Sequence, residues 1–339
     1  MKRCTSCVLP ETFPGIRFDA DGVCQYCRRI PDAATMDVQK ARLRQRLDGL
    51  VEELRDRPGY QCLVSWSGGK DSTYTLHLMK QAYGLRSLAF TFDNGFVSPG
   101  ALRNMRVVAE NLGVDHITVK PRFDVLKQLF IASTRAGMYP LRALERASGI
   151  CNTCMGIAKG IALRLALEEQ VPMLVYGWSP GQIPLTSAIF HSNRRMLQAM
   201  IGAAKAPLED VVDGQVDVFF PENRHWERVQ DVPYNVSPLA FLEYDETTVL
   251  RAIRPLGWER PDDTDPNSTN CLLNGFANRV HIEQLGYHPY AMELAGLVRE
   301  RCMTREEALL RLQDEGAPEV VAAVEEKLGI LGTGHRKEA

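Results

Sequence analysis

The sequence predicts an α/β protein built on a doubly wound parallel sheet, preceded by a small cysteine-rich module and followed by a helical segment. Short apolar runs alternate with helical patterns from residue 60 onward, which is typical of a parallel sheet. Two closely spaced cysteine pairs precede this part and predict a metal-binding module. Near the other end, Thr304-Arg305-Glu306-Glu307 is a capping box, which starts a helix.

The apolar runs set the expected elements. Strands are expected at 62–65, 87–92, 116–119 and 171–177, and helices at 34–57, 73–79, 99–112, 155–169, 305–313 and 317–328. Ligands of such sheets bind at the carboxyl ends of the strands. In order, we expect a zinc ribbon (1–30), a linker helix (31–57), an ATP-binding α/β domain (58–182), an inserted substrate-binding region that completes the site (183–300), and C-terminal helices with a disordered tail (301–339).

The segment Ser65-Trp66-Ser67-Gly68-Gly69-Lys70-Asp71-Ser72 joins the first strand to a helix and suits phosphate binding. Two glycines before a helix N-terminus leave backbone N–H groups pointing outward, and the helix dipole favours an anion there. Lys70 adds a positive charge, while Asp71 or Ser72 can help to place Mg²⁺. The alternative is a turn that carries a lysine by chance. The candidate binding residues are Ser65, Ser67, Gly68, Gly69, Lys70, Asp71 and Ser72.

The string Ser67–Ser72 resembles the PP-loop of the ATP pyrophosphatases, or adenine nucleotide α-hydrolases, whose sheet is HUP-like. The resemblance implies that ATP is split into AMP and pyrophosphate and that AMP passes to a substrate oxygen. It places adenine against the second strand, near Phe90, Thr91 and Phe92, with Asp93 within reach of Mg²⁺ or the ribose. Asp93 suits a cap of the turn 93–95 equally well. Gly177 ends the fourth strand, and residues 178–182 are candidates for the acceptor pocket.

The N-terminal cysteines form two Cys-x-x-Cys pairs, Cys4 with Cys7 and Cys24 with Cys27. Such pairs can meet as four thiolates around one tetrahedral Zn²⁺, a closed and therefore structural site. A module of this size has almost no core of its own, so we expect metal binding to supply its folding free energy, about 10 kcal/mol. Four unrelated thiols are the alternative.

A second set of cysteines lies inside the α/β part. Cys151 and Cys154 open a helix, whose positive end is expected to lower the pKa of both thiols, and Cys271 follows a polar loop. Three thiolates leave one position open on a Zn²⁺ or a [4Fe–4S] cluster, and sulfur-inserting PP-loop enzymes use such a set. A second structural zinc or simply buried thiols remain open alternatives. Cys62 and Cys302 are expected to be buried apolar residues.

Composition argues for a cytoplasmic enzyme. Hydrophobic residues make up 45% and charged residues 24% of the 339 residues, as in an ordinary globular protein. The net charge of −2 disfavours a nucleic-acid-binding surface, although a local basic patch such as Arg194-Arg195 could still grip a phosphate or carboxylate. No apolar run looks long enough to span a membrane, and the start lacks a signal peptide. The oligomeric state stays open, a homo-oligomer included.

Over nearly its whole length, the chain resembles the N-acetyl sugar amidotransferase group of PP-loop enzymes. The matching stretches are Cys4–Cys7, Pro14–Asp19, Asp21–Cys24, Ser67–Ser72, Cys151–Cys154, Asn270-Cys271 and Met303–Ala308. The resemblance implies adenylation of the N-acetyl oxygen of a nucleotide-linked sugar and its replacement by ammonia from a separate glutaminase subunit. The chain departs from the group's pattern at Trp178, where the group has an acidic residue, at the expected acceptor edge.

Three functions follow from these motifs. The first is an ATP-dependent amidotransferase acting on a small-molecule acceptor, with ammonia from a partner. The second is a sulfur transferase that thiolates a small molecule or a nucleic-acid base, with Cys151, Cys154 and Cys271 as catalytic residues and a separate sulfur donor. The third is a sensor that binds ATP without turning it over. In the first two, Lys70 and Asp71 are catalytic and the cofactors are ATP, Mg²⁺ and Zn²⁺, with a [4Fe–4S] cluster in the second.

Overall fold

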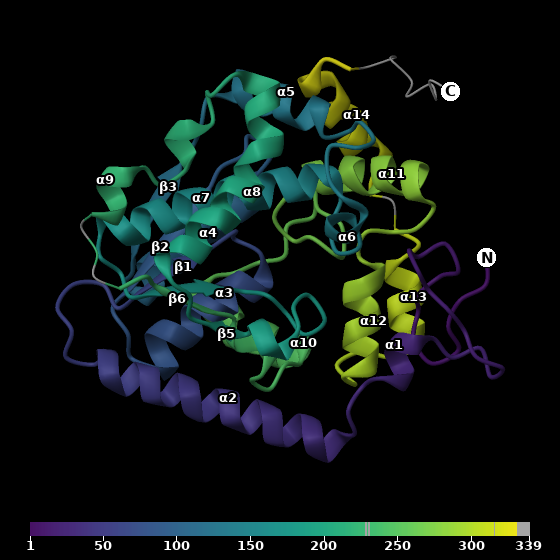
Figure 1. Ribbon diagram of the computed structural model, residues 1–339, viewed down its shortest axis with the longest axis horizontal. Helices are drawn as coiled ribbons and strands as arrows, with labels where there is room; N and C mark the ends of the chain where they lie inside the picture. Colours follow the sequence, from purple (N-terminus) through teal and green to yellow (C-terminus); the bar gives the residue numbers. More distant parts are fainter. Residues whose placement is uncertain (228, 230, 315, 331–339) are drawn as a thin grey trace.

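The computed structural model describes residues 1–227, 229, 231–314 and 316–330, and it centres on a six-stranded sheet of order β3-β2-β1-β4-β6-β5 (Figure 1). Neighbouring strands from β3 to β6 run parallel, and β5 pairs antiparallel with β6 at the edge. The expected disordered tail, from residue 331 on, lies outside the described residues. The strands are β1 (Cys62–Ser65), β2 (Ser87–Phe92), β3 (Asp115–Val119), β4 (Met173–Tyr176), β5 (Ile189–Phe190) and β6 (Tyr234–Val236).

Helices surround the sheet, and α12, α13 and α14 form the last part of the described chain. The α-helices are α1 (Gln25–Arg28), α2 (Ala33–Leu54), α3 (Lys70–His77), α4 (Pro99–Leu112), α5 (Phe123–Ala132), α6 (Leu141–Leu144), α7 (Gly149–Glu168), α8 (Arg194–Val212), α9 (Asn223–Trp226), α10 (Glu246–Ile253), α11 (Leu273–Leu285), α12 (Ala291–Arg299), α13 (Arg305–Arg311) and α14 (Pro318–Leu328). Short helical turns are η1 (Leu78–Ala82), η2 (Leu185–Ser187), η3 (Asp217–Phe219), η4 (Pro238–Ala240) and η5 (Arg254–Leu256).

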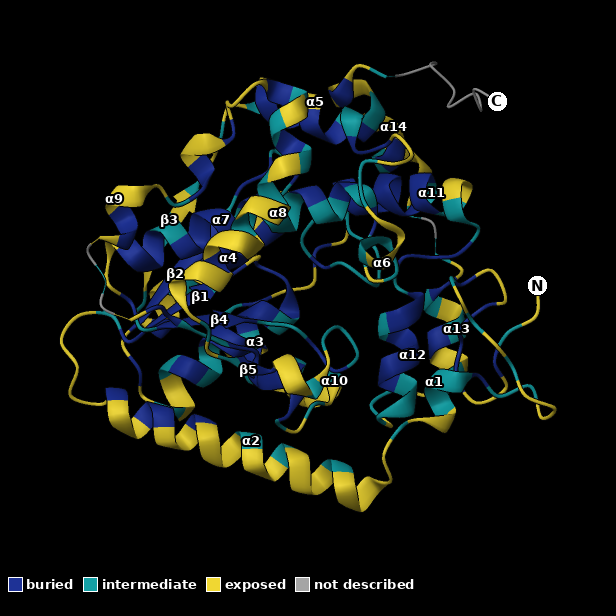
Figure 2. Ribbon diagram, viewed as in Figure 1, coloured by how far each residue is buried: buried dark blue, intermediate teal, exposed yellow. Residues whose placement is uncertain are grey.

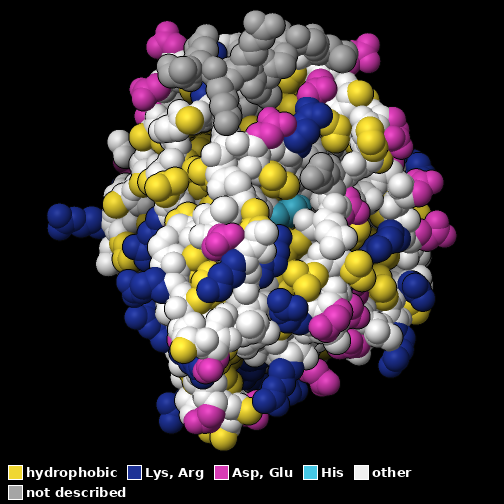
Figure 3. All heavy atoms as spheres, turned by 90° about the vertical axis from the view of Figure 1, so that its right-hand side faces the viewer, with side chains coloured by type: hydrophobic (Ala, Val, Ile, Leu, Met, Phe, Trp, Pro, Cys, Tyr) yellow, Lys and Arg dark blue, Asp and Glu magenta, His cyan; other side chains and the backbone are white. Residues whose placement is uncertain are grey.

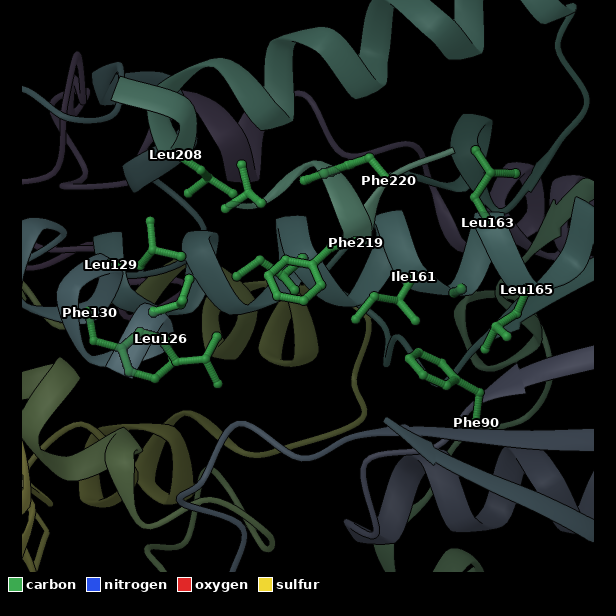
Figure 4. Close-up of a cluster of buried hydrophobic side chains, with 14 of the residues drawn as sticks. Phe90, Leu126, Leu129, Phe130, Ile161, Leu163, Leu165, Leu208, Phe219 and Phe220 are labelled. Carbon is green, nitrogen blue, oxygen red and sulfur yellow. The ribbon is translucent and has the colours of Figure 1, made fainter. Parts of the chain in front are cut away.

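The sheet is covered on both faces, as a doubly wound fold requires. Side chains alternate along a strand, so Leu63 of β1 joins one core cluster while Val64 joins the other. The first cluster includes residues of α5, α7, α8, α11 and α14, and Figure 4 shows Phe130, Ile161 and Leu208 gathered in it. The second includes residues of α3, α4, α10 and the C-terminal part of α2, which is otherwise exposed (Figure 2). The predicted doubly wound parallel sheet is therefore confirmed.

Helix α7 is an exception to the expectation that no segment is long and apolar enough to span a membrane. By length and composition, Gly149–Glu168 is such a helix, with half of its most apolar window buried inside the fold. It contacts β1, β2 and β4 as well as α8 and α11. Its apolar character is explained by this central position, because a helix covered on several sides needs no polar face.

The sheet continues beyond residue 182, where the sequence analysis places the start of an inserted substrate-binding region that completes the site. Strands β5 and β6 come from that region, and Leu174 of β4 pairs with Asn235 of β6. These strands are short and their polar neighbours hide the apolar pattern, so the sequence does not reveal them. Residues 183–236 therefore complete the sheet rather than forming an independent unit.

The N-terminal module packs against helices from the other end of the chain. Figure 1 shows residues near the N-terminus beside α12 and α13, and Phe13 shares a buried cluster with Tyr287 and Leu294. Arg305 donates from Nε to the Cys7 carbonyl oxygen at 3.0 Å and from Nη2 to that of Cys4 at 3.2 Å. The module shares its core with the other end of the chain, because α12 and α13 supply many of the apolar residues of this cluster.

Candidate active site

The loop after β1 is held in shape by its own side chains. Gly68 takes a φ of +80°, which a residue with a Cβ rarely adopts, and Gly69 precedes the first turn of α3. The Ser72 hydroxyl accepts from the Ser67 backbone N–H at 3.2 Å and donates to the Gly69 carbonyl oxygen at 3.1 Å. This is the strand–loop–helix arrangement predicted for phosphate binding.

A segment far along the chain covers the loop. The Thr269 hydroxyl accepts from the backbone N–H of Lys70 at 3.1 Å, and a Cβ added to Gly69 would lie 3.0 Å from the Asn270 side chain. Thr269 therefore occupies a position from which a phosphate oxygen would accept the same hydrogen bond. The sequence analysis missed Thr269, although its place two residues before Cys271 in a polar loop was a usable signal.

Lys70 and Asp71 form a hydrogen-bonded group with Tyr244. The Lys70 Nζ lies 2.8 Å from Asp71 Oδ2 and donates to the Tyr244 hydroxyl at 3.2 Å. Tyr244 donates in turn to Asp71 Oδ1 at 2.9 Å. Burial, and then the Asp71 charge, raises the pKa of Tyr244 well above its usual range, so the phenol keeps its proton and remains a donor. Tyr244, from the segment before α10, was not foreseen.

Gly177, at the end of β4, has a steric role. A Cβ at this position would lie 2.7 Å from the Ser72 Cα and 2.8 Å from its backbone nitrogen. A side chain here would displace the first turn of α3 and with it the loop. The candidate residue thus permits the close approach of two segments that form the site.

Fewer residues of strand β2 line the cavities than the sequence analysis predicts. Phe90 and Thr91 are buried, and the Thr91 hydroxyl donates to the Trp66 carbonyl oxygen at 2.6 Å. Of the three residues predicted to contact adenine, Phe92 alone lines a described cavity. Asp93 accepts from the Gly95 backbone N–H at 2.9 Å and lies 3.1 Å from Lys120 Nζ. Asp93 thus caps its turn, as the alternative interpretation proposed.

Two neighbouring cavities open over the loop. One, of about 270 Å³, contains Lys70 and Asp71 in its lining. The other, of about 510 Å³, contains the three internal cysteines. Residues that line both are Ser65, Ser67, Met155, Ala158, Lys159, Trp178, Gln182, Ser268, Asn270, Tyr290 and Glu293. The two cavities therefore share a wall.

The structure brings the internal cysteines to one cavity. Asn94 donates from Nδ2 to the sulfurs of Cys154 at 3.5 Å and Cys271 at 3.7 Å, while Cys151 lies one helical turn from Cys154. Burial raises the pKa of Cys151 to about 12 and also raises that of Cys154 and Cys271. The prediction of lowered thiol pKa values is wrong, because the loss of hydration outweighs the helix dipole.

Three cysteines around a cavity fit a group that needs three protein ligands and one open position. The Asn94 amide supplies hydrogen bonds of the kind that tune cluster-bound sulfur. Within the described part of the chain, the N-terminal cysteines are the one group of three or more possible ligands whose atoms all lie within 4.8 Å of one another, so the three internal sulfurs do not form such a compact group.

The four N-terminal cysteines form a compact site. Sulfur–sulfur distances are 3.6 Å (Cys24–Cys27), 3.8 Å (Cys7–Cys24) and 3.9 Å (Cys4–Cys27). A tetrahedral ion with metal–sulfur bonds of about 2.3 Å requires sulfurs about 3.8 Å apart, so the residues fit such an ion. The Arg299 guanidinium lies 3.8 Å from the Cys7 sulfur and balances part of the thiolate charge.

Other candidates lie elsewhere. Arg194 and Arg195 are exposed in the first turn of α8, and Arg194 stacks over Trp226 at 5.9 Å, away from both cavities. Trp178 lines both cavities, and Lys159 Nζ lies 5.4 Å from the centre of its ring. Arg311 of α13, a helix to which the sequence assigned no role in the site, lines the smaller cavity and contacts Glu246 at 2.6 Å.

The sheet order, the loop at the switch point between β1 and β4, and the cavity above it define an α/β protein whose ligand site lies at the carboxyl ends of the strands, beside a glycine-containing loop suited to phosphate. No family model matches the chain. An uncharacterized protein of Methanocaldococcus jannaschii, MJ1599, is 21% identical over 323 residues, which cover 94% of this chain and 96% of that protein.

Two solved structures are similar in outline. The U34-tRNA thiolase NcsA from Methanococcus maripaludis, with its [4Fe-4S] cluster, aligns with a TM-score of 0.35 and 16% identity over 89% of this chain and 88% of its own. NMN synthetase from Francisella tularensis aligns with a TM-score of 0.39 and 10% identity over 80% and 95%. At these scores, neither defines the activity of this chain, which is inferred from its own residues.

Proposed function

We propose that the protein is an ATP-dependent transferase that adenylates a carbonyl or amide oxygen of a small-molecule acceptor and then replaces that oxygen with nitrogen. One observation carries this proposal: the cavity that contains Lys70 and the loop shares a wall with a larger cavity, so nucleotide and acceptor could meet there. AMP is a much better leaving group than an amide oxygen, which is the reason for using ATP.

The first half-reaction would use the loop. The Lys70 ammonium and the N–H groups at the start of α3 would stabilise charge on the departing pyrophosphate. Asp71 is the carboxylate nearest to this position and would hold Mg²⁺, which neutralises phosphate charge when bound. Tyr244 holds the Asp71 side chain in place through its 2.9 Å hydrogen bond. ATP would have to displace the Thr269 hydroxyl from the Lys70 N–H.

The second half-reaction would occur at the shared wall. Ammonia from a separate glutaminase subunit would reach the adenylated carbon, and the acceptor would be an N-acetyl sugar or a related small molecule. Lys159, at the junction of the cavities, is suited to an anionic group of either substrate because its amine faces the Trp178 ring and has no carboxylate partner among the described salt bridges. Trp178 would limit water access.

Sulfur transfer is the second candidate, favoured by the single amide of Asn94 that reaches both Cys154 and Cys271. Cys151, Cys154 and Cys271 would hold a [4Fe–4S] cluster, which when bound presents one iron without a protein ligand. A sulfur donor would then replace the glutaminase. The N-terminal cysteines would hold a structural Zn²⁺ in either case.

Two measurements test these proposals. The first is pyrophosphate release from ATP and Mg²⁺ with UDP-N-acetylglucosamine as the probe acceptor and ammonium chloride as the nitrogen source. Acceptor-dependent AMP and pyrophosphate in equal amounts support adenylation, whereas ATP binding without either product would indicate a sensor. The second is an iron, zinc and acid-labile sulfide count on anaerobically purified protein. About four iron and four sulfide per chain would favour sulfur transfer, and zinc alone would favour nitrogen.

A further inference from the structure

Glu293 is a carboxylate in the wall shared by the two cavities. Its Oε1 accepts from the Ser179 hydroxyl at 3.1 Å, and its Oε2 accepts from Gln182 Nε2 at 3.0 Å. The ionisable side chains that line both cavities, among the described residues, are Glu293, Lys159 and Tyr290. Glu293 is the carboxylate among them, and neither of its hydrogen-bond donors is a charged group.

Two glycines fix Glu293 in this position. The turn 178–182 and helix α12 meet backbone to backbone, because a Cβ on Gly296 would lie 2.3 Å from the Gly181 Cα. A Cβ on Gly181 would lie 2.6 Å from the carbonyl oxygen of Glu293 itself. Gly181 also has a φ of +85°, which favours glycine. The contact brings Ser179 and Gln182 within hydrogen-bond distance of the carboxylate.

We propose that Glu293 is the general base of the group-transfer half-reaction, taking a proton from the nucleophile as it attacks the adenylated carbon. This inference rests on the proposed function. In the nitrogen reaction, the ammonia lone pair forms the N–C bond, one N–H proton passes to a Glu293 oxygen, and the C–O bond breaks with its electron pair leaving on AMP. Glu293 then releases the proton to solvent. Proton transfer of this kind contributes about 10²- to 10⁴-fold in rate.

The other candidates fit this role less well. Asp71 already accepts hydrogen bonds from Lys70 and Tyr244 at the loop. Burial raises the pKa of Tyr290 well above its usual range, so it remains a phenol near neutral pH. Burial lowers the pKa of Lys159, but its amine faces the ring of Trp178, a contact that attracts the charged form. A base must be able to accept a proton, which a carboxylate with uncharged donors can do.

The surroundings of Glu293 place its proton equilibrium near neutral pH. Burial, followed by the Asp71 charge, raises the pKa of Glu293 to about 7, while Lys70, Ser179 and Gln182 oppose the rise. A base works best when its pKa lies near the operating pH. The titratable or charged groups around Glu293 come from several elements: Lys70 and Asp71 of α3, Lys159 of α7, Tyr244 before α10, Tyr290 at the N-cap of α12, and Arg146. Arg146 donates to the carbonyl oxygens of Gly181 and Gln182.

The test separates the two half-reactions in the full-length protein. In Glu293→Gln, we expect acceptor-dependent ATP–pyrophosphate exchange with UDP-N-acetylglucosamine to stay within about threefold of the wild type. Product formation, compared at equal concentrations of free ammonia, should fall about 100-fold or more. Its rise with pH near 7, also followed at constant free ammonia, should disappear. Glu319→Gln, an exposed site on α14, is the matched control and should leave both rates unchanged. Equal loss of exchange and product formation, or unchanged product formation, would overturn the role.

Ser179, which positions the Glu293 carboxylate, provides a second test of the role of Glu293. Ser179→Ala removes a hydrogen bond that favours the charged carboxylate, so the pH midpoint of product formation, followed at constant free ammonia, should move upward. A purely structural Ser179 would change the rate at all pH values without moving the midpoint.

The protonation of Glu293 can also be measured without any acceptor. In protein labelled with ¹³C at the glutamate carboxyl, the resonance lost in Glu293→Gln should titrate near pH 7. A midpoint below about 5.5 overturns the inference even if the probe acceptor is inactive, whereas absent pyrophosphate release by the wild type counts against the proposed function alone.

Discussion

Lys70 shows how one side chain can be prepared for a ligand before the ligand arrives. Its side chain is only 9% exposed, and its amine is held by Asp71 and Tyr244 at the edge of the loop. A buried ammonium must have polar partners, and here the same partners orient it toward the cavity. The Lys70 side chain therefore loses most of its conformational entropy on folding, before ATP binds.

Lys70→Ala and Ser67→Ala should each lower the rate of pyrophosphate release by about 100-fold or more, because each removes a group that would contact developing phosphate charge. The circular dichroism spectrum should stay unchanged. If the rate of pyrophosphate release stays within about threefold of the wild type in both variants, the assignment of the loop as the phosphate site is wrong.

Glu293 also makes stability depend on pH. Its folded pKa of about 7 lies above the ordinary value of 4.5, so the folded state binds this proton more tightly than the unfolded state does. The associated stability is present below about pH 4.5 and is lost as the pH rises through 7. Glu293→Gln should therefore raise the melting temperature at pH 8 by about 2–4 °C more than at pH 5.

Calorimetry at the two pH values checks this expectation, with Glu319→Gln as the control. An equal shift at both pH values would indicate that the Glu293 pKa is not raised in the folded protein.

Among the elements, helix α12 connects the two cysteine-containing parts of the chain. Its residues Leu294 and Leu297 belong to the cluster around the N-terminal module and also line the smaller cavity. Arg299 reaches Cys7 from the last turn of the same helix. The metal module therefore supports the element that carries Glu293, which gives an N-terminal structural site a physical connection to the cavity.

The glycine contact between α12 and the turn 178–182 can be tested by adding one methyl group. Gly296→Ala and Gly181→Ala should each destabilise the protein by about 1–3 kcal/mol, because the new Cβ meets backbone that cannot move aside easily. Gly202→Ala is the control: that glycine lies inside α8 with no atom within 4 Å of the added Cβ, so stability should rise by about 0.5–1 kcal/mol.

Urea unfolding measures the three free energies. Similar effects of all three substitutions would show that the backbone contact does not hold α12 in place.

At the scale of the whole molecule, the first and last parts of the chain meet beside the sheet. On the face shown in Figure 3, positive and negative side chains are interspersed, in agreement with the net charge of −2. The N-terminal module contacts α12 and α13 through a buried cluster, and the next element, α2, is tied to the end of α12 by the 2.7 Å ion pair of Lys40 with Glu300. The module and the C-terminal helices should therefore unfold together.

Removal of the N-terminal metal should test this coupling. A strong chelator should release about one zinc per chain and lower the melting temperature by at least about 5 °C, because the thiolates lose their shared ion while α12 loses support. Cys24→Ser should reproduce the effect without chelator, whereas Cys62→Ser, at a buried thiol of β1, should leave the zinc content unchanged. Zinc retained in Cys24→Ser would exclude the four-cysteine site.

How much the sequence predicts depends on whether a signal is local. The start of α4, its end at Gly113 and the capping box at Thr304 follow from a few neighbouring residues and agree with the structure. Strands β5 and β6 have two and three residues and carry no period, so they were missed. Tyr244 was missed because nothing beside it in the chain marks it as a neighbour of Lys70, and the polar loop that contains Thr269 was linked to Cys271 alone.

The sequence by itself determined the doubly wound sheet, the loop at its first strand and the compact set of N-terminal cysteines, since each rests on spacing within a short segment. The tertiary structure decided which residues face the cavities, which thiols are too buried to ionise easily and where Glu293 lies. Those properties depend on contacts between segments more than 100 residues apart, such as Ser179 with Glu293, which differ by 114 positions. Burial and electrostatic surroundings arise from such contacts, so no local pattern can report them.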